Sequence, residues 1–318
     1  MSKFSLAPYT LRLKSKSSRN YLFFGDVLGL DFIDIFYDYL SNVLPASPIN
    51  NKTGEVIKVI SLKKDNRTIY GQFEAGKNGY GSKLLDTITD TVSYERKPLE
   101  AELIPYYFLV RIPSKVDKGI VILQRFNNIG VKTLFFDNLI QYLKDKFSDE
   151  FLVDINPLVP KGLIKEYING RFIKLRLIKQ GYPKDIFDRN PNGMPDENEF
   201  DGQCELVLSA PKNGILPYHI RSMFSTNLDK FLNSDDVSVG SIIEVQNFDY
   251  DNIKMQVRVG NSYKTVDISD MAKLRYYEDI SGIDLNTNGH PKFDIIDSRA
   301  KALLKDLAIS VWGDNIDA

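Results

Sequence analysis

The chain has 318 residues, with 41 basic and 42 acidic side chains, so its formal net charge of -1 excludes a uniformly basic nucleic-acid coat. A single cysteine, Cys204, excludes an intramolecular disulfide and a cysteine-rich zinc site, and the two histidines, His219 and His290, are too few for a three-histidine metal site. No apolar run approaches the ~20 residues of a membrane helix, and Met1–Asn20 lacks an apolar signal core. We therefore expect a cytoplasmic protein with no membrane among its partners.

Apolar periodicity predicts strands and helices along the first half of the chain. In chain order these elements are a strand over 9–16, a helix over 30–44, a hairpin of strands over 55–63 and 67–73, a strand pair over 103–112 and 119–126, and a helix over 131–147. The tract from Ile104 to Ile112 is almost continuously apolar, which predicts a strand covered on both faces.

The second half continues with short elements around a stretch rich in proline and glycine. In chain order we expect a short helix over 160–168, a strand over 171–179, a loop over 182–202, a strand over 205–209, a helix over 219–232, strands over 241–248, 253–259 and 262–268, and a final helix over 295–312.

Hairpins predominate in this order of elements, which favours an α+β fold with mixed, largely antiparallel sheets and packed helices. The breaker-rich stretch is the expected boundary between an N-terminal α+β domain over residues 1–182 and a C-terminal α+β domain over 203–318, with 183–202 as loop or linker. A single large domain is the alternative.

Basic residues on one side of two predicted strands are the most coherent functional pattern. Arg12, Lys14 and Lys16 alternate with Leu11 and Leu13, and Lys174 and Arg176 repeat the pattern in a second strand. If the two strands share one sheet, these cations form a patch for the phosphates of DNA or RNA, beside aromatic side chains for base stacking at Tyr9, Tyr21 and Phe23. The alternative is the ordinary solvent face of an antiparallel sheet.

The segment 188–199 fits the spacing of a calcium-binding EF-hand loop. The oxygen ligands of such a site for Ca²⁺ or Mg²⁺ would be Asp188, Asn190, Asn192, Asp196 and Glu199. Pro191 and Pro195 lie inside the loop, and a plain surface loop of Asn, Asp, Gly and Pro has the same appearance, so we expect no cofactor. A partial repeat over 284–294 lacks the final bidentate acid, because Ile295 stands at the twelfth position.

Other short motifs match catalytic or phosphate-binding patterns less closely. The run Gly76–Lys83 resembles a phosphate loop in which Ser82 and Lys83 are in reversed order, with a helix expected to open at Leu84. Asp86, Asp90 and Glu95 offer the carboxylates of a metal-dependent nuclease, although their spacing is short. His290, beside Pro291, is expected to be a contact at the entry to the last helix.

Three stretches resemble poorly characterised bacterial proteins from phage-defence loci. They are Gly119–Phe135, Ile173–Ile178 and Asn288–Pro291. The resemblance implies a cytoplasmic defence component that senses or touches nucleic acid or a phage protein, with a protein partner from the same operon. It carries over no catalytic residue.

The leading hypothesis is therefore a soluble binding or sensing protein that contacts nucleic acid through Arg12, Lys14, Lys16, Lys174 and Arg176. A divalent-metal-dependent nuclease is one alternative. A protein-interaction module that docks its partner through residues 182–202 is another.

Overall fold

The computed structural model describes residues 3–44, 49–50, 53–127, 129–160, 162, 172–181, 202–212, 214–233, 242–246, 248–259, 262–268 and 275–313. The chain forms two compact units. Unit 1 contains Met1–Leu158 and Arg275–Ala318, and unit 2 contains Val159–Leu274. This division differs from the expected one, because the C-terminal segment returns to the first unit and leaves the second as an insertion.

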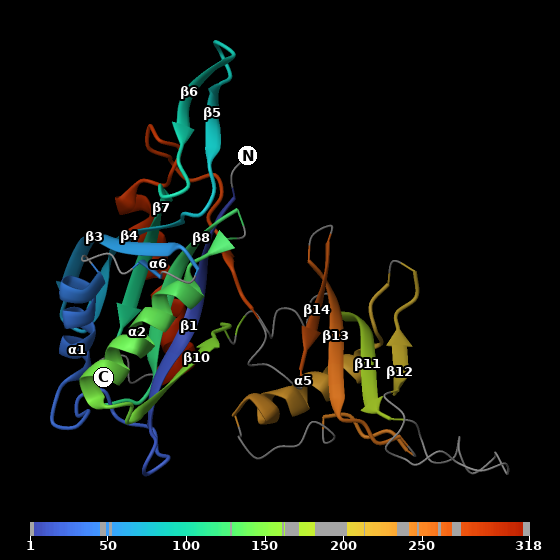
Figure 1. The fold of residues 1–318 in the computed structure, drawn as a ribbon. Helices are drawn as coiled ribbons and strands as arrows, with labels where there is room; N and C mark the ends of the chain where they lie inside the picture. The colour runs from blue at the N-terminus through green and yellow to red at the C-terminus, as the bar shows by residue number, and fades with distance from the viewer. Residues whose placement is uncertain are drawn as a thin grey trace, which may run out of the picture. The chain divides into compact units, whose positions relative to one another are not determined.

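Unit 1 is built on one large antiparallel sheet (Figure 1). Its main path has the strand order β10–β1–β8–β7–β4–β3–β2, while β15 pairs with β1 and β9 pairs with β8. The strands are β1 (Phe4–Ser15), β2 (Ile49–Asn50), β3 (Glu55–Asp65), β4 (Thr68–Lys77), β7 (Glu102–Arg111), β8 (Gly119–Phe126), β9 (Ile129–Gly130), β10 (Phe151–Pro157) and β15 (Glu278–Asp279).

Helices cover both faces of this sheet. On one face lie α1 (Phe32–Asp38), the π-helical turn η1 (Tyr39–Val43) and α2 (Lys132–Phe147), and on the other lies α6 (Phe293–Trp312). Phe108 and Val110 of β7 pack on the side of α1 and α2, whereas Tyr107 and Leu109 pack on the side of α6. The prediction of a strand buried on both faces is therefore confirmed, and so is the α+β class with antiparallel sheets.

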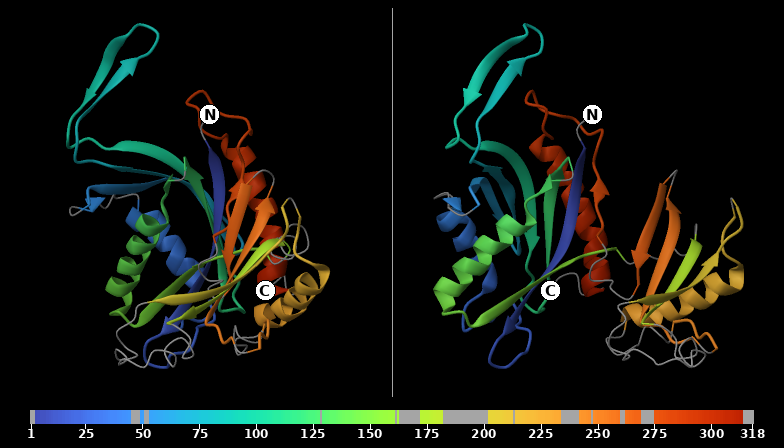
Figure 2. Two further views of the ribbon diagram at one scale, coloured as in Figure 1. Left: turned by 90° about the vertical axis from the view of Figure 1, so that its right-hand side faces the viewer. Right: turned by 45° about the vertical axis from the view of Figure 1, so that its right-hand side comes forward.

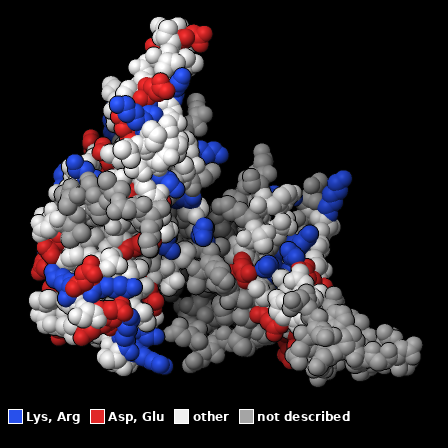
Figure 3. All heavy atoms as spheres, in the orientation of Figure 1, with Lys and Arg blue, Asp and Glu red and all other residues white. Residues whose placement is uncertain are grey.

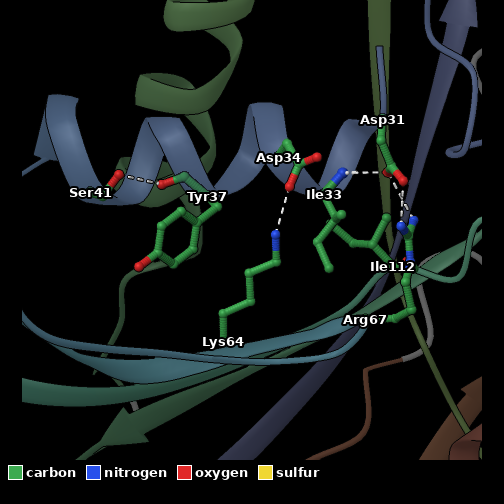
Figure 4. A network of polar contacts seen from close by, with 8 residues as sticks. All are labelled: Asp31, Ile33, Asp34, Tyr37, Ser41, Lys64, Arg67 and Ile112. Carbon is green, nitrogen blue, oxygen red and sulfur yellow. Dashed lines mark hydrogen bonds and ion pairs between the residues drawn. The ribbon is translucent and has the colours of Figure 1, made fainter.

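A carboxylate at the start of α1 fixes this helix to the sheet (Figure 4). Asp31 is the N-cap residue and accepts a hydrogen bond from the backbone N–H of Ile33 at 3.1 Å. Arg67, in the turn between β3 and β4, donates to both Asp31 oxygens at 2.5 and 3.0 Å. Its Nε also donates to the carbonyl of Ile112 at 2.7 Å, so one guanidinium joins the helix start to two strands.

A two-stranded arm projects from unit 1 between β4 and β7 (Figures 1 and 2). It consists of β5 (Ser82–Asp86) and β6 (Thr91–Arg96), so the expected helix opening at Leu84 is wrong. Leu84 faces Tyr94 across the arm, and Ile88 at the tip is 94% exposed. The apolar side chains of the arm are thus largely in solvent, where two strands alone cannot bury them.

The chain leaves and re-enters unit 1 at neighbouring positions on β1. The backbone N–H of Leu158, after β10, donates to the carbonyl of Pro8 at 3.0 Å. Two residues earlier on β1, Leu6 pairs with Glu278 of β15. The large sheet is therefore completed by residues from both ends of the sequence.

Unit 2 contains a four-stranded antiparallel sheet in the order β12–β11–β13–β14. Its elements are β11 (Phe172–Gln180), β12 (Gln203–Ser209), α5 (Tyr218–Asn233), β13 (Asn252–Val259) and β14 (Ser262–Asp267). Phe224 of α5 packs with Leu175, Met255 and Val266 in one core, so the helix covers one face of the sheet. The strand expected over 241–248 is wrong for the described residues of that range, which form turns and irregular chain.

Candidate nucleic-acid interface

The two basic strands of the sequence prediction lie in different sheets. Arg12, Lys14 and Lys16 are on β1 in unit 1, whose neighbours are β8, β10 and β15. Lys174 and Arg176 are on β11 in unit 2, between β12 and β13. The prediction that both sets share one sheet is therefore wrong, because each strand is paired on both edges within its own unit.

Acidic neighbours neutralise two of the three cations of β1, and the third, Lys14, lies 5.5 Å from the centre of the Tyr21 ring. Arg12 forms an ion pair with Asp117, and Lys16 forms one with Asp149. The guanidinium of Arg12 also lies 3.3 Å from the centre of the Tyr21 ring, whose hydroxyl donates to Asp154 at 2.7 Å. The hydrogen bond to Asp154 is the main reason that the pKa of Tyr21 is raised. This side of β1 is a structural network of mixed charge and not an open basic face.

The strands of unit 2 separate apolar and basic side chains onto opposite faces. Leu175 and Leu177 of β11 are buried in the core under α5, so Lys174 and Arg176 point to the other face. The same alternation on β13 buries Met255 between positions that face outward. We call the side of the sheet opposite α5 the outer face.

Strand register brings basic and polar side chains together on the outer face. Arg176 lies opposite Lys254, and Lys174 lies opposite Gln256, which in turn faces Thr265 of β14. These side chains line a cavity of about 290 Å³. Its lining residues are Lys174, Arg176, Glu205, Val207, Lys254, Gln256 and Thr265. Figure 3 shows basic side chains over the strands of unit 2, with acidic ones beside them.

Two carboxylates reduce the positive charge of the outer face. Arg176 donates to Glu205 of β12 through Nε at 3.0 Å and through Nη2 at 2.5 Å. Lys254 lies 3.9 Å from Asp267, which lies outside the cavity lining. Lys174 forms no ion pair with any residue that the structure describes. Three cations and one carboxylate line the cavity, so the lining keeps a net positive charge.

The sequence analysis found two residues of the cavity lining and missed five. It singled out Lys174 and Arg176, whereas the other five were assigned only to strands; they are Glu205, Val207, Lys254, Gln256 and Thr265. The signal was present, because residues 253–257 alternate apolar and polar side chains as residues 173–177 do. What the sequence does not contain is the pairing of β11 with β13, which are separated by about seventy residues.

The candidate metal site of the loop over 188–199 lies outside the described residues. Asp188, Asn190, Asn192, Asp196 and Glu199 all belong to that part of the chain. Among the residues that are described, no group of three or more His, Cys, Asp or Glu side chains has the arrangement of a metal site.

The carboxylates proposed for a nuclease have local structural contacts in the β5–β6 arm. Asp86 accepts hydrogen bonds from the backbone N–H groups of Ile88 and Thr89, and this is the main cause of its lowered pKa. Glu95 stands opposite Lys83 on the neighbouring strand. Asp86 therefore stabilises a turn and Glu95 belongs to a cross-strand pair. These contacts do not bring the two carboxylates together at one site.

The partial repeat of the loop motif forms a tight turn before α6. The Asn286 side chain accepts from the backbone N–H groups of Asn288 and His290. The His290 ring lies 6.4 Å from that of Phe4 and 5.6 Å from that of Phe126, and burial lowers its pKa. His290 is thus a packing contact at the entry to the helix, as expected.

Comparisons with known proteins assign no family to the chain. A comparison of the chain with models of known protein families found no match, and a comparison with curated proteins found none either. Within the part of the chain that the structure describes, every helix is too short or too polar to span a bilayer.

Proposed function

We propose that unit 2 binds nucleic acid through its outer face, and that the protein acts as a binding or sensing component. The observation that carries this proposal is the convergence of Lys174, Arg176 and Lys254 around one cavity on the face opposite the core. Three cations on two adjacent strands, about 5 Å apart between strands and about 7 Å apart along β11, match a charged polymer better than a single small anion.

The neutral members of the face suit the same ligand. Gln256 and Thr265 add hydrogen-bond donors without adding negative charge. Side chains of these types contact phosphate and sugar oxygens, which position a nucleic acid without selecting its sequence. The proposed ligand is therefore DNA or RNA of unspecified sequence. A role in phage defence, with a protein from the same operon as partner, remains an expectation from the resemblance described above.

Salt-dependent binding to random-sequence nucleic acid tests this proposal. We would measure fluorescence anisotropy with labelled single-stranded DNA, duplex DNA and RNA while the salt concentration rises. The double variant Lys174→Glu/Lys254→Glu is expected to lose binding, and Lys174→Gln alone to reduce the slope of log K against log salt by about 1.

Charge-matched variants provide the control. Lys115→Glu/Lys212→Glu changes two lysines located in turns and is expected to bind as the parent protein does. Arg12→Glu is also expected to keep binding, since Arg12 is already paired with Asp117. Absence of binding at low salt, or equal loss in the control and the double variant, would reject the proposal.

A further inference from the structure

The outer face of unit 2 continues beyond the cavity, toward the end of the β13–β14 strand pair where Val259 faces Ser262. Arg258 lies two residues beyond Gln256 on β13. Tyr263 lies two residues before Thr265 on β14. Side chains two residues apart on a strand point to the same side of the sheet, so Arg258 and Tyr263 belong to the face that carries the cavity lining.

Buried residues on the same two strands agree with this orientation. Val257, between Gln256 and Arg258, lies in the core with Phe224 of α5, and so does Val266 of β14. Tyr263 has the opposite orientation to Val266 by alternation and is 58% exposed. The large ring therefore stands in solvent on the outer face.

A cation lies beside this ring. Tyr263 is directly opposite Arg258 in the strand register, and the guanidinium carbon of Arg258 lies 5.7 Å from the centre of the Tyr263 ring. This distance is within the range of a cation–π contact. Arg258 forms no ion pair with any residue in the described part of the chain. We call these two residues the Tyr–Arg pair.

Strand register arranges the outer face in rows that cross β11, β13 and β14. The successive rows are Arg176–Lys254, Lys174–Gln256–Thr265 and Arg258–Tyr263. Neighbouring rows are about 7 Å apart, because each row is two residues further along the strands. The first two rows contain the three cations of the cavity lining, and the third places an aromatic ring next to them.

An exposed ring beside cations distinguishes single strands from duplexes. Cations attract the phosphates of a duplex at least as strongly as those of a single strand, because the duplex has the higher charge density. A ring can stack only on a base whose face is accessible, and the bases of a duplex are covered by one another. The cations alone would therefore favour the duplex, whereas the Tyr–Arg pair adds binding energy only for a single strand.

We infer that the outer face binds single-stranded nucleic acid, with phosphates at Lys174 and Lys254 and a base stacked on Tyr263. This inference rests on the function proposed above and adds the class of nucleic acid to it. Every base has a face that can stack, so the contact at Tyr263 is tolerant of sequence. That tolerance agrees with a lining of lysine, arginine, glutamine and threonine, which contacts phosphate and sugar.

Fluorescence anisotropy with the full chain tests the preference for single strands. The labelled probes are oligothymidine and oligouridine of about sixteen nucleotides and a mixed-sequence duplex of about sixteen base pairs. At one salt concentration, the tighter of the two single strands is expected to bind about tenfold more tightly than the duplex. The comparison of oligothymidine with oligouridine identifies DNA or RNA as the better single strand.

Substitutions of tyrosine separate stacking from charge. Tyr263→Ala is expected to weaken single-strand binding about tenfold and to change duplex binding less than about twofold, while Tyr263→Phe keeps the ring and should retain the affinity of the parent. Tyr218→Ala is the matched control. Tyr218 is 69% exposed and lies 6.0 Å from the guanidinium carbon of Arg221, but it belongs to α5, on the opposite side of the sheet.

A fluorescent side chain at the same position reports the stacking directly. The chain has one tryptophan, Trp312 of α6, so the emission of the parent can be subtracted from that of Tyr263→Trp. Quenching of the remaining emission by oligothymidine or oligouridine is expected, and the duplex should leave it unchanged.

The outcomes distinguish this inference from the proposed function. Equal or tighter binding of the duplex, or equal effects of Tyr263→Ala and Tyr218→Ala, would overturn the inference. If binding is nevertheless lost in Lys174→Glu/Lys254→Glu, the outer face still binds nucleic acid, without selecting single strands. Absence of binding to every probe would overturn both.

Discussion

Arg176 on β11 holds both carboxylate oxygens of Glu205 on the neighbouring strand β12. The side chains of this pair are 37% and 20% exposed, respectively, so water reaches the guanidinium while the carboxylate is more enclosed. The carboxylate occupies the donors that a phosphate would use. A nucleic acid that approaches the outer face therefore competes with Glu205 for Arg176.

Replacing this carboxylate is expected to strengthen binding to nucleic acid. Glu205→Gln removes one negative charge from the cavity lining and frees the Arg176 donors, so affinity at low salt should rise about three- to tenfold. Anisotropy titrations at several salt concentrations would measure the change. Glu244→Gln removes an exposed carboxylate elsewhere in unit 2 and is the control. Unchanged or weaker binding in Glu205→Gln would contradict phosphate contact at Arg176.

The hydrogen bond between Tyr107 and Asp297 is expected to contribute to the stability of unit 1. The Tyr107 hydroxyl, on β7, donates to Asp297 of α6 at 2.7 Å, and Lys301 donates to the other oxygen at 2.8 Å. Tyr107→Phe leaves Asp297 with one partner fewer, and should lower the free energy of unfolding by about 1–2 kcal/mol. Chemical denaturation followed by circular dichroism would measure it. Tyr80→Phe, at an exposed tyrosine, should change stability by much less.

Excision of unit 2 is expected to leave a folded unit 1. Leu158 and Glu278 lie at neighbouring positions along β1, so a short Gly-Ser linker from Leu158 to Arg275 closes the chain without distortion. The protein that lacks unit 2 should unfold in a single cooperative transition. A truncated protein that ends at residue 182 lacks α6 and should bind a dye specific for exposed apolar surface. Similar behaviour of the two proteins would show that α6 is dispensable.

The stability of unit 1 in acid is expected to depend on Asp38. Hydrogen bonds from Tyr142, then from Lys146 and Asn42, lower the pKa of Asp38 from 3.8 to about 2. A carboxylate with a lowered pKa in the folded state stabilises that state above its unfolded pKa, and this contribution is lost as the pH falls toward 2. Because the pair with Lys146 is partly exposed, its contribution should stay below about 1 kcal/mol.

Asp38→Asn should therefore differ from the parent at pH 6 and converge with it near pH 2. Urea denaturation at a series of pH values would show the convergence. Asp137→Asn, at an exposed site on α2, controls for the loss of one surface carboxylate. A constant difference between parent and Asp38→Asn over this range would contradict the assignment.

Local patterns in the sequence were sufficient for many elements and for the orientation of their side chains. The alternation around Lys174 and Arg176 predicts correctly which residues point away from the core, and the apolar tract containing Phe108 predicts a doubly covered strand. These properties depend on neighbours within a few residues. The same reasoning could not identify a two-stranded arm at Leu84, because the arm has no core of its own to impose an apolar period.

Long-range pairing accounts for what sequence reasoning missed. Arg12 has the same alternating context as Arg176, but its partner Asp117 is distant in sequence and reaches it only through the pairing of β1 with β8. The insertion of unit 2 was missed for a similar reason. The apolar stripe of α6 is compatible with any sheet, and only its packing on Leu6 and Ile122 assigns it to unit 1.

The late position of α6 in the sequence sets an order of events during translation. When the ribosome has synthesised the chain through Leu274, unit 2 is complete, whereas the sheet face with Phe4, Leu6 and Ile122 still lacks its covering helix. At roughly 5–20 residues per second, this face stays open for several seconds. During that interval, a chaperone that binds apolar strands and the emerging helix compete for the same surface of the nascent chain.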